Sequence, residues 1–218
     1  MTEAAVLPRG DAVAQMGSAV PSDGRNRRAA ETRRKIIEAA KAMIAETSEA
    51  PTVVGVAKRA DVSVRSVFQH FGDVESLFVT VVDAVRDDIV VPPAPPASRP
   101  LVDRIDIVVQ NLAQVFDRIV PLRVAAGHFA GHPALVERAN TLKQELRETT
   151  FEVFAPEFAN LSVEAREELA DAIGVALSLD AWVVLRRRDG MTFERALAVW
   201  RLTLTALLEH GLGATAAK

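Results

Sequence analysis

Apolar side chains recur at every third or fourth position along most of this chain, and that spacing gives a helix one apolar face. The pattern predicts a long amphipathic helix over residues 29–47, two short helices within 52–71, and a fourth over 73–89. Since no stretch alternates with a period of two for long enough to predict a strand, the expected fold class is all-α. Five more helices are expected near 101–119, 121–130, 133–155, 162–189 and 192–210.

Proline and glycine mark the ends of the expected helices. The run from Pro92 to Pro96, together with Pro100, cannot lie inside a helix and forms the clearest internal break. Residues 1–24 are rich in Ala, Gly, Pro and Ser without a clear period, which indicates a disordered tail. The later helices are separated by Pro121, Pro133, Pro156, Ser162 and Gly190 to Thr192.

Residues 52–71 are predicted to form two short helices joined by a tight turn. Thr52 and Ser63 are candidate N-caps, because a side-chain hydroxyl can accept a hydrogen bond from a free backbone N–H. The turn has Asp61 where such turns usually have Gly, and Asp tolerates the positive φ required there better than most residues. Two helices that cross steeply over a short turn form a helix-turn-helix, which commonly presents its second helix to the DNA major groove. An ordinary helical hairpin in an all-α core is the alternative.

The charge distribution separates the N-terminal segment from the rest of the chain. Residues 25–71 contain ten Lys and Arg and five Asp and Glu, a net charge of +5, whereas residues 72–218 carry −6 and the whole chain −3. A basic segment that contains the helix-turn-helix, followed by an acidic body, is typical of a protein that contacts phosphates at one end. The expected domains are a tail over 1–24, a three-helix DNA-binding domain over 25–72 and a larger helical domain over 73–218.

Several classes of protein are not expected from this composition. Cysteine is absent, which excludes disulfides, thiolate metal sites and a cysteine nucleophile. No stretch of 18 or more uncharged apolar residues predicts a membrane span, and the first residues lack a secretion signal, so we expect a cytoplasmic protein without a membrane partner. Nucleophile elbows, phosphate-binding loops, dinucleotide-binding turns and metal-ligand clusters are also absent from the sequence, so we expect neither an enzyme nor a cofactor.

Three motifs frame the helix-turn-helix: Thr32-Arg33-x-x-Ile36-Ile37-x-Ala39-Ala40, Thr52-Val-x-x-Val56-Ala57-x-x-Ala60-x-Val62-Ser63 and His70-Phe71-x-x-x-Glu75-x-Leu77. Through them, residues 29–82 resemble the TetR (tetracycline-repressor-like) family of transcriptional regulators. The later residues resemble that family only in the number and length of their helices and in an Ala/Leu-rich last pair. The resemblance implies a homodimer whose two recognition helices enter successive major grooves of a palindromic double-stranded DNA operator. It also implies a second domain that forms the dimer and binds a small-molecule effector.

Two positions depart from the family pattern. Members usually carry Tyr where Phe68 stands, and Lys where Val74 stands near the start of the fourth helix. Each lost phosphate contact removes about one unit from the log–log salt dependence of DNA binding. We therefore expect weaker contacts to the DNA backbone unless the N-terminal arginines compensate for them.

The polar face of the second short helix supplies the base-reading candidates. Arg65 is expected to read a guanine edge, because a guanidinium can donate to both guanine acceptors at once. Gln69 is expected at a base or a phosphate, the hydroxyl and imidazole groups nearby at phosphates, and the basic residues around the start of the first helix in an arm that contacts phosphates or the minor groove. The candidate DNA-contacting residues are Arg27, Arg28, Arg33, Thr52, Ser63, Val64, Arg65, Ser66, Phe68, Gln69 and His70.

Aromatic and basic residues of the second domain are the ligand-binding candidates, although an aromatic side chain at helical spacing is more often part of a core. His128 and His132 have the spacing of a metal-binding pair, but no third ligand is visible and we expect no metal site. The ligand-binding candidates are Phe116, Arg123, His128, Phe129, Phe151, Phe154 and Trp182.

Apolar stripes on the last two helices are assigned by the resemblance to a four-helix dimer interface, with burial inside one subunit as the alternative. The interface candidates are Leu177, Ala181, Val184, Leu185, Ala198, Leu202, Thr205 and Leu208.

The sequence as a whole predicts a sequence-specific DNA-binding transcriptional regulator. We expect a repressor whose operator affinity changes when a small apolar or amphipathic ligand binds in the second domain. An all-α protein-interaction module without DNA binding is the alternative, and a steep salt dependence of DNA affinity separates the two.

Overall fold

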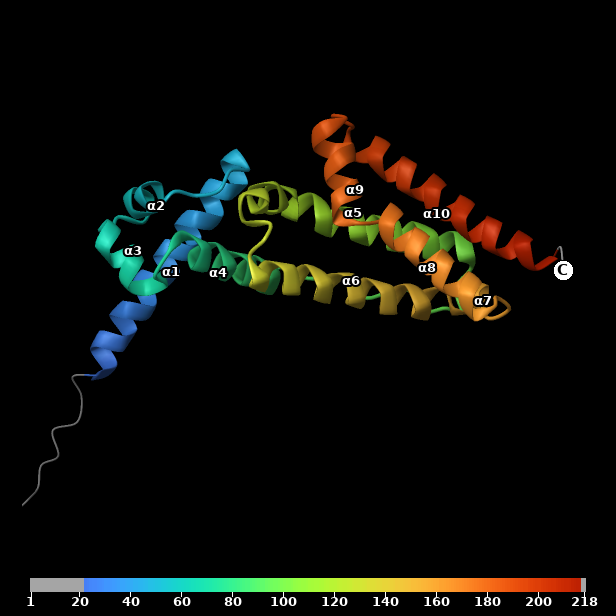
Figure 1. Cartoon of the computed structure of the whole chain (residues 1–218), viewed down its shortest axis with the longest axis horizontal. Coiled ribbons are helices and arrows are strands. Elements are labelled where there is room, and N and C mark those ends of the chain that lie inside the picture. The colour runs from blue at the N-terminus through green and yellow to red at the C-terminus, as the bar shows by residue number, and fades with distance from the viewer. Residues whose placement is uncertain (1–21, 217–218) are drawn as a thin grey trace, which may run out of the picture.

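A computed structural model describes residues 22–216, and these form helices joined by loops (Figure 1). The predicted all-α fold class is confirmed for this part of the chain. The N-terminal helices are α1 (Ser22–Thr47), α2 (Val53–Ala60), α3 (Val64–Phe71) and α4 (Val74–Asp87). After the proline-rich loop come α5 (Leu101–Ala125), the short 3-10 helix η1 (Ala126–Phe129), α6 (Pro133–Val153), α7 (Ala155–Phe158), α8 (Val163–Ala176), α9 (Leu179–Val183), the π-helical turn η2 (Val184–Arg188) and α10 (Phe193–Ala216).

Helix boundaries differ from the sequence prediction at three places. Helix α1 begins at Ser22, so the last residues of the expected tail are helical, while residues 1–21 lie outside the described part of the chain. Helix α5 continues through Pro121, where a break was expected. The single helix expected over 162–189 is divided into α8, α9 and η2, because the Ser178 hydroxyl accepts a hydrogen bond from the Ala181 N–H at 3.1 Å and starts a new helix.

Helix α5 stays helical through Pro121 because apolar packing holds both sides of the proline. Val120 belongs to the core of the C-terminal helices, whereas Leu122 and Ala125 pack in the core of the N-terminal helices. The proline lacks an N–H and so removes one hydrogen bond of the helix. A small void of about 60 Å³ lies beside it, between α1, α4 and α5.

The N-terminal core is formed by α1 to α4 together with the end of α5 and η1. The rings of Phe78 on α4 and Phe129 on η1 lie 4.7 Å apart between centroids and join these parts. Helix α4 therefore packs with α1 to α3, although the sequence pattern placed residues 73–218 in the second domain. The buried side chains of this core are Ile36, Ala39, Ala40, Ile44, Val56, Ala57, Ala60, Val67, Phe71, Leu77, Phe78, Val81 and Ala125.

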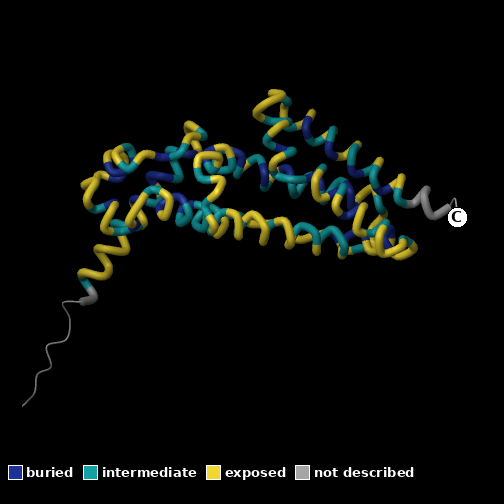
Figure 2. Tube along the Cα trace, in the orientation of Figure 1, coloured by how far each residue is buried: buried dark blue, intermediate teal, exposed yellow. Residues whose placement is uncertain are grey.

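The C-terminal core lies among α5 to α10, with two tryptophans at its centre. The ring of Trp200 lies 4.5 Å from that of Trp182 and 5.9 Å from that of Phe116. Helix α6 contributes little to this core, since Val153 is its one buried residue. Most of α6 is exposed or half-buried along its length (Figure 2).

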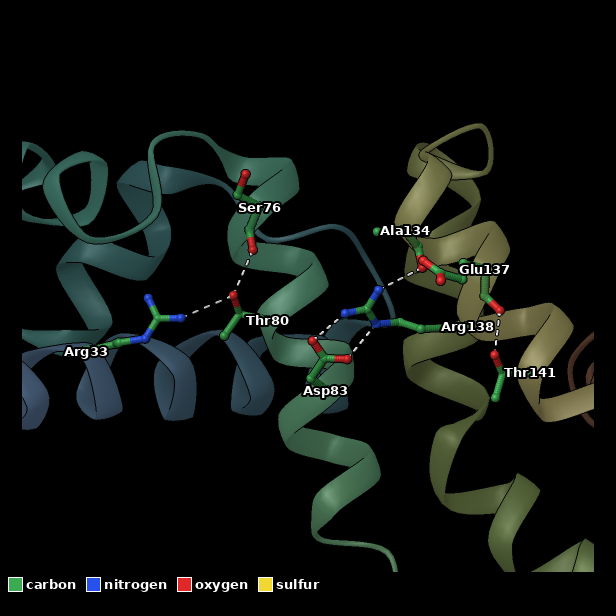
Figure 3. A network of polar contacts seen from close by, with 8 residues as sticks. All are labelled: Arg33, Ser76, Thr80, Asp83, Ala134, Glu137, Arg138 and Thr141. Atoms are coloured by element: carbon green, nitrogen blue, oxygen red, sulfur yellow. Dashed lines mark hydrogen bonds and ion pairs between the residues drawn. The ribbon is translucent and has the colours of Figure 1, made fainter. Parts of the chain in front are cut away.

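Ion pairs join α6 to α4. Arg138 donates to both carboxylate oxygens of Asp83, at 2.5 and 2.6 Å (Figure 3). Further along the two helices, Arg86 donates to Glu145 at 2.6 Å. The two pairs have opposite polarity, because α4 supplies the acid of one and the base of the other.

A further ion pair, between Arg104 at the start of α5 and Glu157 on α7, is buried. Its two hydrogen bonds are 2.7 Å long, and the side chains are only 4% and 9% exposed. The guanidinium also donates to the backbone carbonyls of Arg99 at 2.8 Å and Val153 at 2.7 Å. These bonds offset the cost of removing both charges from water, and they fix α7 to the start of α5.

Glu157→Ala is expected to lower the free energy of unfolding by about 3–5 kcal/mol, because it leaves the buried Arg104 charge without a partner. The double variant Arg104→Met, Glu157→Leu should regain most of this loss. Denaturant unfolding measures both. The exposed pair of Arg201 and Asp106 is the control, and Asp106→Ala should cost no more than about 1 kcal/mol. Equal losses at the two pairs would contradict the expected role of burial.

Candidate nucleic-acid interface

The turn between α2 and α3 has the backbone conformation that the sequence predicted. Asp61 lies in the left-handed region, with φ 54° and ψ 50°. Its N–H donates to the carbonyls of Ala57 and Lys58, and the N–H of Val62 donates to Ala57 at 3.0 Å. These bonds end α2 and turn the chain, so that α3 crosses it as the second helix of a helix-turn-helix (Figure 1).

Hydroxyl side chains cap both helices as predicted. Thr52 accepts from the Gly55 N–H at 3.1 Å, and Ser63 accepts from the Ser66 N–H at 3.0 Å. Both residues are exposed. Each hydroxyl oxygen accepts a hydrogen bond in its cap, so its own proton remains available to donate. Each hydroxyl also lies at the N-terminus of a helix, which is the positive end of the helix dipole. The two caps are therefore suited to binding phosphate.

Gly55 is required by the close approach of α2 to α1. A Cβ atom at this position would lie 2.8 Å from the Met43 Cε atom and 2.9 Å from the Thr52 hydroxyl oxygen. A larger residue would therefore displace the end of the Met43 side chain and the Thr52 hydroxyl that caps α2.

Helix α3 divides into a buried and an exposed face. Val67 and Phe71 are buried in the N-terminal core. Arg65 and Gln69, one turn apart, are exposed and form no hydrogen bond with another described side chain or backbone group. Val64 and Phe68 form an apolar stripe beside them and are 38% and 48% exposed, while Ser66 and His70 are half-buried.

The Arg33 guanidinium forms hydrogen bonds with other groups of the protein. Its Nη1 donates to the His70 carbonyl at 3.1 Å, and its Nη2 lies 3.5 Å from the Thr80 hydroxyl. The Thr80 hydroxyl in turn donates to the backbone carbonyl of Ser76 (Figure 3). The guanidinium also lies 4.4 Å from the centroid of the Phe71 ring. These contacts hold the end of α3 against α1 and α4. The phosphate contact expected of Arg33 stays a prediction.

The basic residues that were expected to form an arm at the start of the first helix lie on α1 itself. Their contact with phosphates or the minor groove stays a prediction. No Gly or Pro occurs between Arg25 and Glu49, so nothing interrupts α1 there. Arg27 and Arg28 are exposed on its first turns. The cations of residues 25–71 that form no ion pair or side-chain hydrogen bond with another described residue are Arg25, Arg27, Arg28, Lys35, Lys58 and Arg65.

Lys35 and Lys58 are absent from the sequence candidates, although both are exposed. Both lysines were counted among the ten basic residues of the segment 25–71. Only the structure shows which of those residues already form ion pairs. Both terminal nitrogens of Arg59, for example, donate hydrogen bonds to the Glu46 carboxylate at 2.6 Å. At the start of α4, the Ser76 N–H donates to Asp73 at 2.7 Å and lowers the pKa of that carboxyl.

The ligand-binding candidates do not come together at one site. Phe116, Phe154 and Trp182 are buried in the C-terminal core, while Phe129 belongs to the N-terminal core. His128 is exposed. The remaining two candidates are Arg123, which pairs with Asp180 at 2.6 Å, and Phe151, which is half-buried beside Phe158.

The interface candidates fall into three groups by burial. Leu177 and Leu208 are buried inside the C-terminal core, so burial within one subunit accounts for both. Val184, Ala198 and Leu202 are exposed, and Leu202 has 71% of its surface accessible. The half-buried candidates are Ala181, Leu185 and Thr205.

No described helix is long and apolar enough to cross a membrane. Within residues 22–216, no three His, Asp or Glu side chains gather in a way that could hold a metal ion.

Replacing Asp61 tests the left-handed turn. Asp61→Ala should be less stable than Asp61→Gly by about 1–2 kcal/mol, because a Cβ is strained at this φ and glycine is not. The order should reverse at the exposed helical residue Lys58, where Ala is favoured over Gly by about 1 kcal/mol. Thermal or denaturant unfolding of the four variants measures both differences. If Ala and Gly proved equal at position 61, the backbone conformation would differ from the one described.

No protein-family model matches this chain, and no curated protein matches its sequence. Two solved structures share its architecture. A TetR-family transcriptional regulator from Streptomyces coelicolor gives a TM-score of 0.55 at 15% sequence identity, over 84% of this chain and 89% of that one. A protein from Mesorhizobium loti assigned to the same family gives 0.51 at 17% identity, over 84% and 97%. The chain therefore has the fold of the TetR-family transcriptional regulators.

Proposed function

We propose that this protein is a sequence-specific DNA-binding transcriptional regulator whose α3 enters the major groove. The observation that carries the proposal is the exposed face of α3. There Arg65 and Gln69 are free of intramolecular partners, and the capped ends of α2 and α3 lie close by in the sequence. Helices presented in this way read base edges, while the groups around them bind the backbone.

In the proposed complex, Arg65 donates to a guanine edge and Gln69 to a base or phosphate. The hydroxyls of Thr52 and Ser63 donate to phosphates, and Ser66 and His70 contact the backbone beside them. The exposed cations of α1 and Lys58 add charge that follows the DNA backbone. Arg33 positions α3 from behind.

Phe68 has a role in this proposal that does not need a hydroxyl. It lies one helical turn from Val64 on an exposed apolar stripe. The thymine methyl is the apolar group that base pairs present in the major groove. Val64 and Phe68 would contact such a methyl, whereas the usual tyrosine at the second position would bind a phosphate.

The proposed assembly is a homodimer on a palindromic operator, formed through the exposed apolar residues of α8, η2 and α10. Val175 on α8 joins Val184, Ala198 and Leu202 in this set, although the sequence candidates omit it. Val175 is 74% exposed in the structure, and this exposure identifies it as an interface candidate. The sequence does not identify it, because an isolated aliphatic side chain on a charged helix forms no periodic apolar stripe. A second copy that covers these side chains would remove them from water.

The regulator is proposed to act as a repressor whose operator affinity changes when a small apolar or amphipathic ligand binds among the C-terminal helices. The support comes from the fold shared with the two solved regulators and from the polar contact between α4 and α6. Asp83 and Arg86 of α4 bind α6 directly, so a movement of α6 would reach the helix-turn-helix through α4.

Arg65→Ala is expected to weaken binding to the selected operator by about 1–3 kcal/mol and to relax the preference at one base pair. Lys58→Ala should instead weaken binding to all duplexes alike and reduce the salt slope by about one. Lys143→Ala, at an exposed position of α6 outside the proposed interface, is the control without an effect. Fluorescence anisotropy on duplexes selected from a random pool measures all three. Absence of any salt-dependent DNA binding by the parent protein would favour an all-α protein-interaction module.

Leu202→Glu is expected to convert the dimer to a monomer at micromolar concentration, because the new charge would be buried against the second copy. Light scattering measures the mass. Val136→Glu is the control, since Val136 is exposed on α6 outside the proposed interface and should leave the dimer intact. A parent protein with the mass of a monomer would contradict the dimer, and an unchanged Leu202→Glu dimer would place the interface elsewhere.

A further inference from the structure

The end of α6, α7 and the start of α8 meet at the end of the molecule opposite the helix-turn-helix (Figure 1). Residues of these three helices line a hollow there. Its volume is about 360 Å³. Pockets that bind small molecules usually have volumes of about 300–1,000 Å³, so this hollow is large enough for a compact ligand. It is lined by Phe151, Ala155, Phe158, Ala159, Arg166 and Glu167.

Aromatic rings and small side chains form the apolar part of the hollow. The rings of Phe151 and Phe158 lie 5.2 Å apart between centroids, and Phe158 is buried. Ala155 and Ala159, four residues apart, are exposed and leave space above the rings. An aryl or alkyl group of a ligand could therefore lie against the half-buried Phe151 ring, with Phe158 packed behind it.

Arg166 supplies the uncompensated charge of the hollow. Its Nε is buried and has no hydrogen-bond partner, and its Nη2 lies 3.5 Å from the Phe158 carbonyl. Arg166 takes part in none of the ion pairs found among residues 22–216. A buried donor without an acceptor destabilises the folded protein, whereas a guanidinium binds a carboxylate through two parallel hydrogen bonds.

The other charged residue that lines the hollow, Glu167, forms an ion pair within the protein. Arg147 of α6 pairs with Glu167 and with Asp171 of α8, and its guanidinium lies 5.3 Å from the centroid of the Phe151 ring. Glu157 of α7 is paired with the buried Arg104. The hollow thus combines an apolar lining with one positive charge that forms no ion pair among the described residues.

We propose that this hollow binds a small amphipathic carboxylate, an aryl- or alkyl-substituted acid. The carboxylate binds the Arg166 guanidinium, and the apolar group packs against the Phe151 ring. One of the ligand-binding candidates from the sequence, Phe151, lines this site, whereas Phe116, Phe154 and Trp182 are buried in the C-terminal core. The proposal names the position and chemical class of the effector, and only its effect on DNA rests on the proposed function.

Helix α6 connects this site to the helix-turn-helix. Phe151 lies near its C-terminal end, while Arg138 and Glu145 bind Asp83 and Arg86 of α4. Val153 is the one buried residue of α6, and two ion pairs join α6 to α4. A bound acid that moves the C-terminal end of α6 would therefore change these contacts with α4. Operator affinity then changes with ligand concentration.

The first experiment measures ligand binding by the full chain without DNA. Phenylacetate, 3-phenylpropionate and octanoate are compared with their neutral amides by thermal shift and calorimetry. The acids should raise the Tm, and the amides should bind at least about tenfold more weakly because they lack the charge that pairs with Arg166. Equal binding of acid and amide, or no binding of any acid, overturns the proposal.

Variants assign the binding to this hollow. Arg166→Gln should reduce the affinity for the acids at least about tenfold, whereas Arg195→Gln, which changes an exposed cation on α10, should not. Ala159→Leu keeps Arg166 and fills the hollow, so it should abolish binding of acids and keep the protein folded. Unchanged affinity in Ala159→Leu overturns the site even if Arg166→Gln does not fold.

The second experiment measures operator affinity with and without the acid that binds best. A change that is lost in Ala159→Leu supports the regulatory role of the site. A protein that binds operator but none of the acids overturns this inference and leaves the proposed function standing. A protein that binds the acids through Arg166 but no DNA supports the site and overturns the proposed function.

Discussion

Helix α5 is the element on which both cores depend. Its first part buries Val109, Ala113 and Phe116 among the C-terminal helices, and its last turn buries Ala125 among α1 to α4. Separating either core from α5 would expose apolar side chains at about 25 cal/mol for each Å². The place of the helix-turn-helix relative to the body is therefore fixed by apolar packing on one long helix.

The contact between α4 and α6 differs in kind from the packing on α5. Asp83, Arg86, Arg138 and Glu145 are only partly buried, and exposed ion pairs contribute little to stability and exchange readily with water and salt. A rearrangement can thus keep both cores intact while α6 changes its partners on α4. The buried pair of Arg104 and Glu157 marks the limit of this freedom, because breaking it is costly.

The sequence predicted those parts of the interface that depend on local chemistry. The caps at Thr52 and Ser63 and the left-handed Asp61 follow from neighbouring residues alone, and all three are confirmed. The contacts of Arg33 within the protein were not predicted, because its carbonyl partner at His70 is distant in sequence. The ligand-binding candidates proved to lie in different places, because the contacts between helices are also distant in sequence. Helical spacing indicates that an aromatic side chain is buried, but it does not show which helix covers that side chain. Half-buried charged groups such as Arg166 showed no periodic pattern in the sequence.

Pro121 gives α5 a mechanical property that the packing alone does not reveal. The carbonyl of the residue four positions earlier, Asp117, lacks its helical N–H partner, so one rung of the helix is missing where the two cores meet. The void of about 60 Å³ beside it leaves room on the side of α1 and α4. Since a helix resists bending through its hydrogen bonds and the packing around it, the missing hydrogen bond makes the turn at Pro121 the least stiff part of the α5 backbone.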